Sequence, residues 1–212
     1  GLSRLRALLT AFPNTYMAVA QDGQASRRFW RDRKRLGAIA ARTNAFKLNE
    51  DIVLPIEALA EFAAFVDDLN IEEERSNQVE VILYLNTYLE KAEPLEDPAW
   101  LSAKLPRARQ LLKDALDQIK LAGRKHLRLE THLKTVLGSM AELLRGFSKV
   151  TAEMDRDVAE IRSRCIVVAT HMHAGDGNVH VNIPVFSNDR EMMRRAAEVA
   201  DTIMEKAVAL EG

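Results

Sequence analysis

Cysteine is nearly absent from this sequence, because Cys165 is the only one among 212 residues. A single cysteine excludes an internal disulfide framework and is typical of a reducing compartment, so we expect a cytoplasmic protein, either free or peripheral at the inner membrane. Long hydrophobic runs are absent too, and none approaches the roughly 20 residues that a helix needs to cross a bilayer. Neither charge is in excess, since 30 Lys and Arg stand against 31 Asp and Glu. A nucleic-acid-binding surface would show a marked basic excess, so we expect no nucleic-acid partner.

The sequence does contain enough apolar material for a core, with 47% hydrophobic and 29% charged residues. This composition excludes global disorder, and the length allows one large domain or a domain that carries an insertion. The chain starts at Gly1 rather than Met and ends directly after a helix-like apolar pattern. We therefore expect a piece of a longer protein.

Apolar patterns predict alternating strands and helices towards both ends of the chain. The predicted strands are 15–20, 51–54, 166–173 and 179–185, and the predicted helices are 26–41, 56–69, 79–89 and 189–210. Pro55 ends the second strand because it has no N–H to give to a ladder. This order predicts an α+β fold, with a small ferredoxin-like antiparallel sheet and helices on one face. We expect its first part at 1–71, a helical insertion at 72–162 and its second part at 163–212.

The insertion has its own periodicity between Leu105 and Met154. Apolar residues recur there at alternating steps of three and four, interrupted by His126, and this period of 3.5 is typical of long helices packed as in a coiled coil. Gly123 could divide the segment into a helical hairpin. If the apolar seam is exposed, we expect self-association, and the chain could then be a helical module for protein interaction. A seam buried within its own hairpin would count against that function.

A cluster of histidines stands out in 166–185, IVVATHMHAGDGNVHVNIPV. A two-residue turn at Asp176-Gly177 would set His173 opposite His180, and His171 opposite Asn182. All four side chains would then share one polar face, because side chains two apart on a strand point the same way. Opposed side chains have Cβ atoms about 4.5–5.5 Å apart, so two imidazoles could hold one divalent ion such as Zn or Mn. Two nitrogens make an incomplete site, which normally has a third protein ligand.

Three stretches together resemble a known family. They are HAGDGNVHVN after residue 172, RTNAFKLNEDIVLP before residue 56, and the basic helix segment FWRDR at 29–33. All three are similar to the C-terminal domain of FAD-linked oxidases of the vanillyl-alcohol-oxidase type, the group of D-lactate dehydrogenases, the glycolate oxidase flavin subunit and D-2-hydroxyglutarate dehydrogenase. The sequences of these motifs most resemble those of long bacterial D-lactate dehydrogenase-like flavoproteins. The resemblance covers residues 15–70 and 165–212. The insertion at 72–162 is not accounted for by the resemblance to the smaller members of the family.

The resemblance implies an FAD-dependent dehydrogenase of D-2-hydroxy acids, with D-lactate as the expected substrate. It implies that His173 and His180 bind the metal, and that Asn182, Lys47 and Arg33 contact the substrate. Arg33 departs from the pattern in part, since Gly37 stands where some relatives carry a threonine. Arginine and lysine suit the carboxylate of a hydroxy acid, and a divalent ion lowers the pKa of its hydroxyl.

Some of the family's parts are not expected in this chain. The end at 204–212 resembles the helix before the family's Gly-Glu-His-Gly segment, so its third metal ligand and its catalytic histidine would lie beyond Gly212. The resemblance also implies an FAD-binding domain in the same parent chain as a partner, and no glycine-rich segment for the flavin occurs here. We therefore expect this piece to be inactive alone and to bind metal weakly. His171 or Asp176 could substitute as a ligand, although a turn tip disfavours Asp176.

A third functional class is a zinc-dependent hydrolase, in which a metal-bound water attacks an acyl or phosphoryl centre. Such an enzyme needs a carboxylate base facing the metal, and the histidine hairpin carries none.

Overall fold

The computed structural model describes residues 2–12, 17–39, 46–91 and 98–212, and the chain divides into a unit of residues 1–44 and a unit of residues 45–212. The first unit contains α1 (Leu2–Leu9) and α2 (Gly23–Ile39). Asp22 caps α2, because its Oδ1 accepts the main-chain N–H groups of Gln24 and Ala25, each over 2.8 Å. The strand predicted at 15–20 is wrong for Met17–Ala20, which form no strand, and residues 15–16 lie outside the described residues. A β-prone run becomes a strand only where another strand pairs with it.

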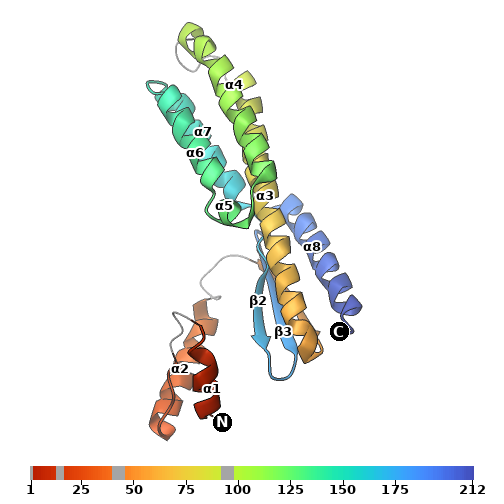
Figure 1. Cartoon of the computed structure of the whole chain (residues 1–212). Coiled ribbons are helices and arrows are strands. Elements are labelled where there is room, and N and C mark those ends of the chain that lie inside the picture. The colour runs from red at the N-terminus through yellow and green to blue at the C-terminus, as the bar shows by residue number, and fades with distance from the viewer. Residues whose placement is uncertain (1, 13–16, 40–45, 92–97) are drawn as a thin grey trace. The chain divides into compact units, whose positions relative to one another are not determined.

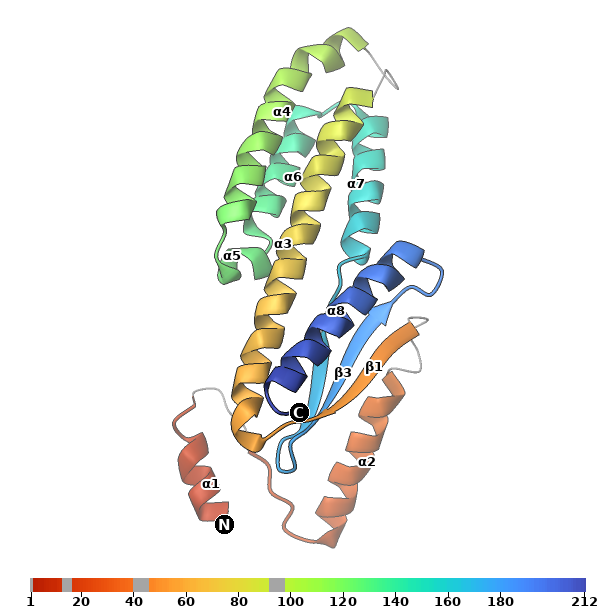
Figure 2. The same cartoon turned by 90° about the vertical axis from the view of Figure 1, so that its right-hand side faces the viewer.

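A three-stranded antiparallel sheet forms the base of the second unit. Its strands are β1 (Phe46–Val53), β2 (Ala169–His173) and β3 (Asn178–Val185), in the order β1-β3-β2. Apolar side chains alternate along β3, so that Val179, Val181, Ile183 and Val185 are all buried. Two helices cover that face: the first part of α3 (Leu59–Lys91) and α8 (Arg190–Ala209), as Figure 2 shows. The predicted α+β fold with helices on one face of the sheet is confirmed.

Helix α3 is a single helix of 33 residues, preceded by the short 3₁₀ turn Ile56–Ala58 (η2). The sequence predicted two helices here, 56–69 and 79–89, and residues 70–78 between them are mostly polar. Those polar side chains are instead bonded to other elements: Asn70 exchanges two hydrogen bonds with the main chain of Val168, over 2.8 and 2.9 Å. Asn77 and Gln78 are fully buried and bonded as well. One rigid helix therefore runs through both the sheet core and the helical insertion (Figure 1).

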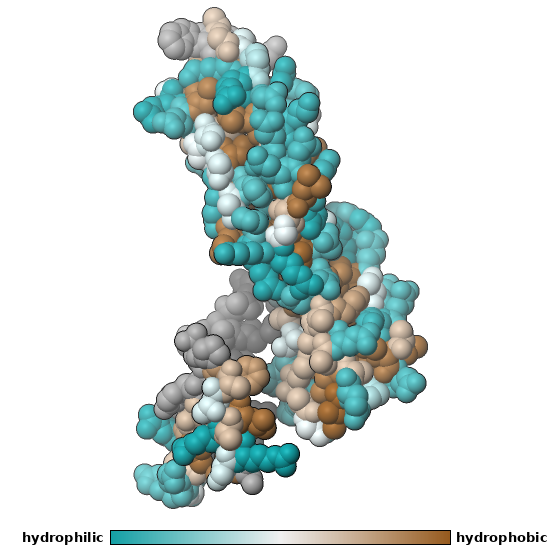
Figure 3. Space-filling view, viewed as in Figure 1, coloured by the Kyte–Doolittle hydropathy of each residue, from teal (hydrophilic) through white to brown (hydrophobic). Residues whose placement is uncertain are grey.

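The insertion forms a helix bundle on the far part of α3. Its helices are α4 (Pro98–Leu121), α5 (Arg124–Arg128), α6 (Thr131–Leu143) and α7 (Ser148–Ser163). The predicted helical content of this segment is confirmed, and Figures 1 and 2 show the bundle extending away from the sheet. Members of the predicted seam form its core, among them Leu112, Ile119, Val136 and Met140. The face of the bundle seen in Figure 3 is mainly hydrophilic with separated apolar patches. Most of the predicted seam is buried within the bundle, although Leu129 is 55% exposed.

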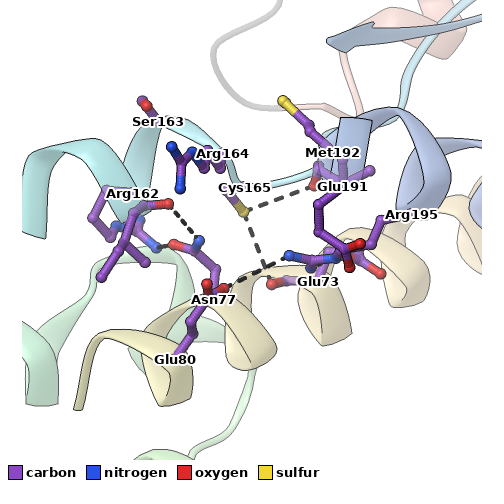
Figure 4. A network of polar contacts seen from close by, with 12 residues as sticks. Glu73, Asn77, Glu80, Arg162, Ser163, Arg164, Cys165, Glu191, Met192 and Arg195 are labelled. Atoms are coloured by element: carbon purple, nitrogen blue, oxygen red, sulfur yellow. Dashed lines mark hydrogen bonds and ion pairs between the residues drawn. The ribbon is translucent and has the colours of Figure 1, made fainter. Parts of the chain in front are cut away.

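A polar network joins the bundle to the sheet layer (Figure 4). Arg162 of α7 donates to Asn77 Oδ1 over 2.5 Å and pairs with Glu74 over 2.9 Å, both on α3. Asn77 in turn donates to the main-chain oxygen of Ile161 over 2.9 Å. Arg195 of α8 pairs with Glu73 over 3.0 Å. These contacts fix α7 and α8 against the same stretch of α3, where the two apolar cores meet.

Within the described part of the chain, no helix is both long enough and apolar enough to cross a bilayer. The cytoplasmic location and the domain boundaries expected from the sequence stay predictions. The apolar cores do not decide the domain boundaries, because α3 contributes residues to both cores.

Candidate substrate and metal site

The histidine hairpin exists, but its register differs from the predicted one. Strands β2 and β3 pair with His171 opposite His180 and with His173 opposite Asn178. The turn holds four residues, 174–177, in place of the two at Asp176-Gly177. Asp176 N–H donates to His173 O over 3.1 Å, which closes a turn that begins two residues earlier than predicted. Because the register moved by two residues, the alternation of faces is unchanged, and the predicted shared face of His171, His173 and His180 is confirmed.

Gly177 ties this turn to the end of β1. Its φ is +76°, a left-handed conformation that favours glycine, and its carbonyl accepts the N–H of Leu54 over 2.9 Å. A Cβ atom added at Gly177 would lie 2.1 Å from Leu54 O. Only glycine allows this approach, so position 177 requires glycine.

The three imidazoles form a compact triangle on the open face of the sheet. The ring centroid of His171 is 5.4 Å from that of His173 and 6.0 Å from that of His180, and the last two centroids are 5.6 Å apart. Asp51 of β1, paired opposite His180, forms a hydrogen bond with His180 Nδ1 through its Oδ1. In a neutral imidazole that bond places the proton on Nδ1, because a carboxylate accepts, and leaves Nε2 with its lone pair.

A surface pocket of about 490 Å³ adjoins the triangle. It is lined by Asn49, Asp51, His171, His180, Val181 and Asn182. Asn49 and Asn182 are directly paired in the ladder between β1 and β3. The pocket therefore offers two carboxamides, two imidazoles and a carboxylate, a set suited to a small polar ligand.

Asn178 adds an unusual feature beside His173, its partner in the β2–β3 ladder. Its Oδ1 is buried and has no hydrogen-bond partner among the described residues. A buried polar atom without a partner is costly, so such atoms commonly mark the place of a water, an ion or a ligand. The atom lies on the strand face of His180 and Asn182, since positions 178, 180 and 182 alternate with the buried valines.

The predicted site residues are only partly described. His173, His180 and Asn182 share the polar face of the hairpin, and Asn182 and His180 line the same pocket. Lys47 is in β1, where its main chain pairs with Pro184, and Arg33 is in α2. The side chains of Lys47 and Arg33 lie outside the described residues, so their substrate contacts stay predictions.

Two residues of the pocket were missed by sequence reasoning. Asn49 and Asp51 alternate along β1 and meet the hairpin only through strand pairing. The pattern Asn-x-Asp before Pro55 was the available signal, since alternate polar residues indicate the open face of a strand. Choosing their partners required the register, which depends on contacts between segments about 130 residues apart.

The side chains on this face have donor atoms of the kind that a metal ion binds, but they do not form a site that is ready to hold one. Three imidazoles and a supporting carboxylate are the ligand chemistry of Zn²⁺ and related ions. Among the described residues, however, no three histidine, cysteine or carboxylate groups already converge on one point as a bound ion requires. Metal binding thus needs small ring movements, and it stays a prediction.

Comparison with known families settles the kind of protein. The family model described as FAD linked oxidases, C-terminal domain, matches residues 2–87 and 133–212, which is more than half of the chain. The chain belongs to this family. Searches among curated proteins and among solved structures each found no match. Family membership indicates an FAD-linked oxidoreductase.

The match is wider than the resemblance that the sequence motifs carried at 15–70 and 165–212. It includes most of α3 and nearly all of α6 together with α7, so these helices belong to the family's domain. Residues 88–132 lie between the two matched stretches and contain the end of α3, α4 and α5.

Proposed function

We propose that this chain forms the substrate- and metal-side part of an FAD-dependent D-2-hydroxy-acid dehydrogenase, with D-lactate as the substrate. The observation that carries the proposal is the polar face of the sheet. There, His171, His180, Asp51 and Asn182 line one pocket, and the ring of His173 lies beside those of His171 and His180, in a chain of the FAD-linked oxidase family.

Each proposed role follows from the chemistry of the residue. His173 and His180 hold a divalent ion through neutral ring nitrogens, and the bond from Asp51 keeps His180 in the tautomer that can do so. The carboxamide of Asn182 donates to an oxygen of the substrate, and Lys47 and Arg33 pair with its carboxylate. A divalent ion held there would lower the pKa of the substrate hydroxyl, and FAD would supply the acceptor for the hydride.

The interaction-module alternative has weak support, because the seam is buried. Ile119, Met140 and Val150, all in the predicted heptad series, have 0% exposed surface. A seam that already packs against α3 offers no apolar stripe to a second chain. Self-association through the insertion is therefore not part of the proposal.

The structure adds a carboxylate near the histidines, but this residue does not support the hydrolase alternative. Asp51 supplies the nearby carboxylate that the hairpin itself lacks. Its Oδ1 is engaged with His180 Nδ1, so it orients a ring rather than activating a water. Membership of an FAD-linked family also supports redox chemistry over hydrolysis.

Flavin reduction tests the proposal directly. The FAD-containing protein that includes this chain is mixed anaerobically with D-lactate, L-lactate, glycolate or D-2-hydroxyglutarate, and loss of flavin absorbance is followed by stopped flow. We expect reduction by D-lactate to be fastest. If another D-2-hydroxy acid is faster, the assignment of D-lactate is wrong, and if no hydroxy acid reduces the flavin, the whole proposal is wrong.

Asn182→Ala provides the site-specific arm of the experiment. We expect a higher KM for the hydroxy acid with normal flavin content, because one hydrogen bond to the substrate is lost. Asn86→Ala is the matched control, since Asn86 lies on the bundle part of α3 and makes a single contact of 3.5 Å with Glu90. An equal change in both variants would remove Asn182 from the site.

A further inference from the structure

Two asparagines face each other on the open side of the sheet. Asn49 of β1 is paired with Asn182 of β3, and both side chains line the pocket beside the histidines. Within the described part of the chain, neither carboxamide has a hydrogen-bond partner, whereas Asp51 on the same strand is bonded to His180. Asparagine is depleted in strands because its short polar side chain adds little packing there. The sheet itself therefore gains little from this asparagine pair, and its amide groups are available to a ligand.

Strand register places the asparagine pair in the middle of the polar face. One row along the strands is formed by Asp51 and His180, and the row on the opposite side of the pair contains Lys47. Neighbouring rows on one face are about 6.8 Å apart, because each residue of an antiparallel strand advances by about 3.4 Å. A hydroxy acid with its hydroxyl towards the histidine row and its carboxylate towards the Lys47 row must therefore lie over the two asparagines.

The hydrogen-bonding groups of the pair match those of a carboxylate. A carboxylate only accepts hydrogen bonds, and each carboxamide supplies two N–H donors. Asp51 also only accepts, and the side chain of Val181 is buried in the core, so neither side chain can donate to the ligand. Directly paired residues have Cβ atoms about 4.5–5.5 Å apart. At this spacing the amide of Asn182 can serve one carboxylate oxygen and that of Asn49 the other.

We propose that Asn49 is a further substrate-binding residue, whose Nδ2 donates to one carboxylate oxygen while Asn182 donates to the other. This inference rests on the proposed oxidation of a 2-hydroxy acid. A carboxylate has about four acceptor sites, so it accepts both bonds in addition to the proposed pairing with Lys47 and Arg33. The two amides fix the direction of the acid on the sheet, with its hydroxyl towards the histidines.

Two substitutions at one position separate substrate binding from a structural role. Asn49→Ala removes the donor, and Asn49→Asp keeps the shape of the side chain but replaces its N–H groups by a negative oxygen. Asn86→Ala and Asn86→Asp make the same changes on the bundle part of α3. Flavin content and thermal unfolding verify that each variant folds.

Both measurements use the FAD-containing protein that includes this chain. Flavin reduction gives the KM for D-lactate, and calorimetry gives the dissociation constant of pyruvate, its oxidation product, without any turnover. If D-2-hydroxyglutarate reduces the flavin faster, it and 2-oxoglutarate replace these two probes.

We expect Asn49→Ala to raise the KM and the dissociation constant by about 10- to 150-fold, the usual effect of losing one hydrogen bond to a charged group. The limiting rate of flavin reduction should change much less, because the contact is made equally before and during the reaction. Asn49→Asp should weaken binding more than Asn49→Ala, since its charge repels the carboxylate. Both Asn86 variants should match the wild type.

The contrary results differ in what they overturn. If Asn49→Asp is milder than Asn49→Ala, the shape of the side chain matters rather than its N–H groups, and the inference is wrong. If both Asn49 variants match the Asn86 controls while the wild type oxidises a hydroxy acid, the inference is wrong and the proposed function stands. If the wild type neither binds the 2-oxo acid nor is reduced by any hydroxy acid, both are overturned.

Discussion

Leu54 and Gly177 are in direct main-chain contact. The N–H of Leu54 donates to Gly177 O over 2.9 Å, and any Cβ at Gly177 would lie 2.1 Å from Leu54 O. This contact holds the hairpin turn against the end of β1 and extends the pairing of β1 with β3 by one position. On the other side of β3, His171 lies opposite His180.

Gly177→Ala should therefore destabilise the fold and disturb the histidine triangle. A non-glycine residue at positive φ costs about 1–3 kcal/mol, and the overlap with Leu54 adds to this. Urea unfolding measures the loss. Gly175→Ala is the control, because a Cβ there has no neighbour within 4 Å, and comparable losses in both variants would show that the contact with Leu54 does not matter.

Asn77→Ala should loosen the junction between the bundle and the sheet layer. Asn77 is fully buried and links Arg162 on α7 to the main chain of Ile161, so its loss leaves buried groups without partners. We expect about 1–3 kcal/mol less stability per group left unsatisfied. Hydrogen exchange should show faster opening at the start of β2 as well as in α7. Asn86→Ala on the same helix should change stability by about 0.5 kcal/mol or less.

Leu112→Ala tests whether the heptad seam is a core. Leu112 has 1% of its surface exposed, so we expect a loss of about 2–5 kcal/mol, measured by thermal or urea unfolding. Leu121→Ala is the matched control, because Leu121 is on the same helix and is 88% exposed. We expect this variant to lose about 0.5 kcal/mol of stability or less. Sedimentation of both variants should match the wild type in mass. A loss of self-association in Leu112→Ala would contradict the buried seam.

Cys165 should react slowly at neutral pH. Burial, followed by the negative charge of Glu74, raises the pKa of this thiol from 9.0 to about 12. Since the thiolate is the nucleophile, alkylation by iodoacetamide, followed by mass spectrometry, should be much slower than in the urea-unfolded chain.

The same shift makes stability depend on alkaline pH. The folded thiol keeps a proton that the unfolded thiol loses near pH 9, so the contribution of Cys165 is fully present below pH 9 and is lost as pH rises towards 12. Cys165→Ala should flatten that decline between pH 9 and pH 10. Rapid alkylation of the native protein at pH 8 would show that the thiol is not protected.

Lys47→Ala should affect substrate binding in the FAD-containing enzyme. The loss of one charge-assisted contact with a carboxylate costs about 1.5–3 kcal/mol, so we expect KM to rise by roughly 10- to 150-fold. Flavin content should remain normal. Lys120→Ala, in the bundle, is the control with the same change of charge. A variant that loses flavin but keeps its KM would assign Lys47 to the cofactor.

Local periodicity determined much of this protein. Alternation along 179–185 predicted which residues of β3 are buried, and the steps of three and four from Leu105 to Met154 predicted the bundle core. Both predictions are confirmed because the direction of a side chain within a helix or strand depends on its own backbone. For the same reason, a register error of two residues left the shared face of His171, His173 and His180 unchanged.

Tertiary structure alone decided how these elements meet. The pairing of Asp51 with His180 joins segments 129 residues apart. The continuity of α3 through residues 70–78 depends on partners such as Val168 and Ile161. The last residue of the hairpin turn, Gly177, bonds to Leu54, which precedes it by more than 100 positions. Such contacts have no periodic signature, because their free energy comes from groups that become neighbours only after the chain has folded.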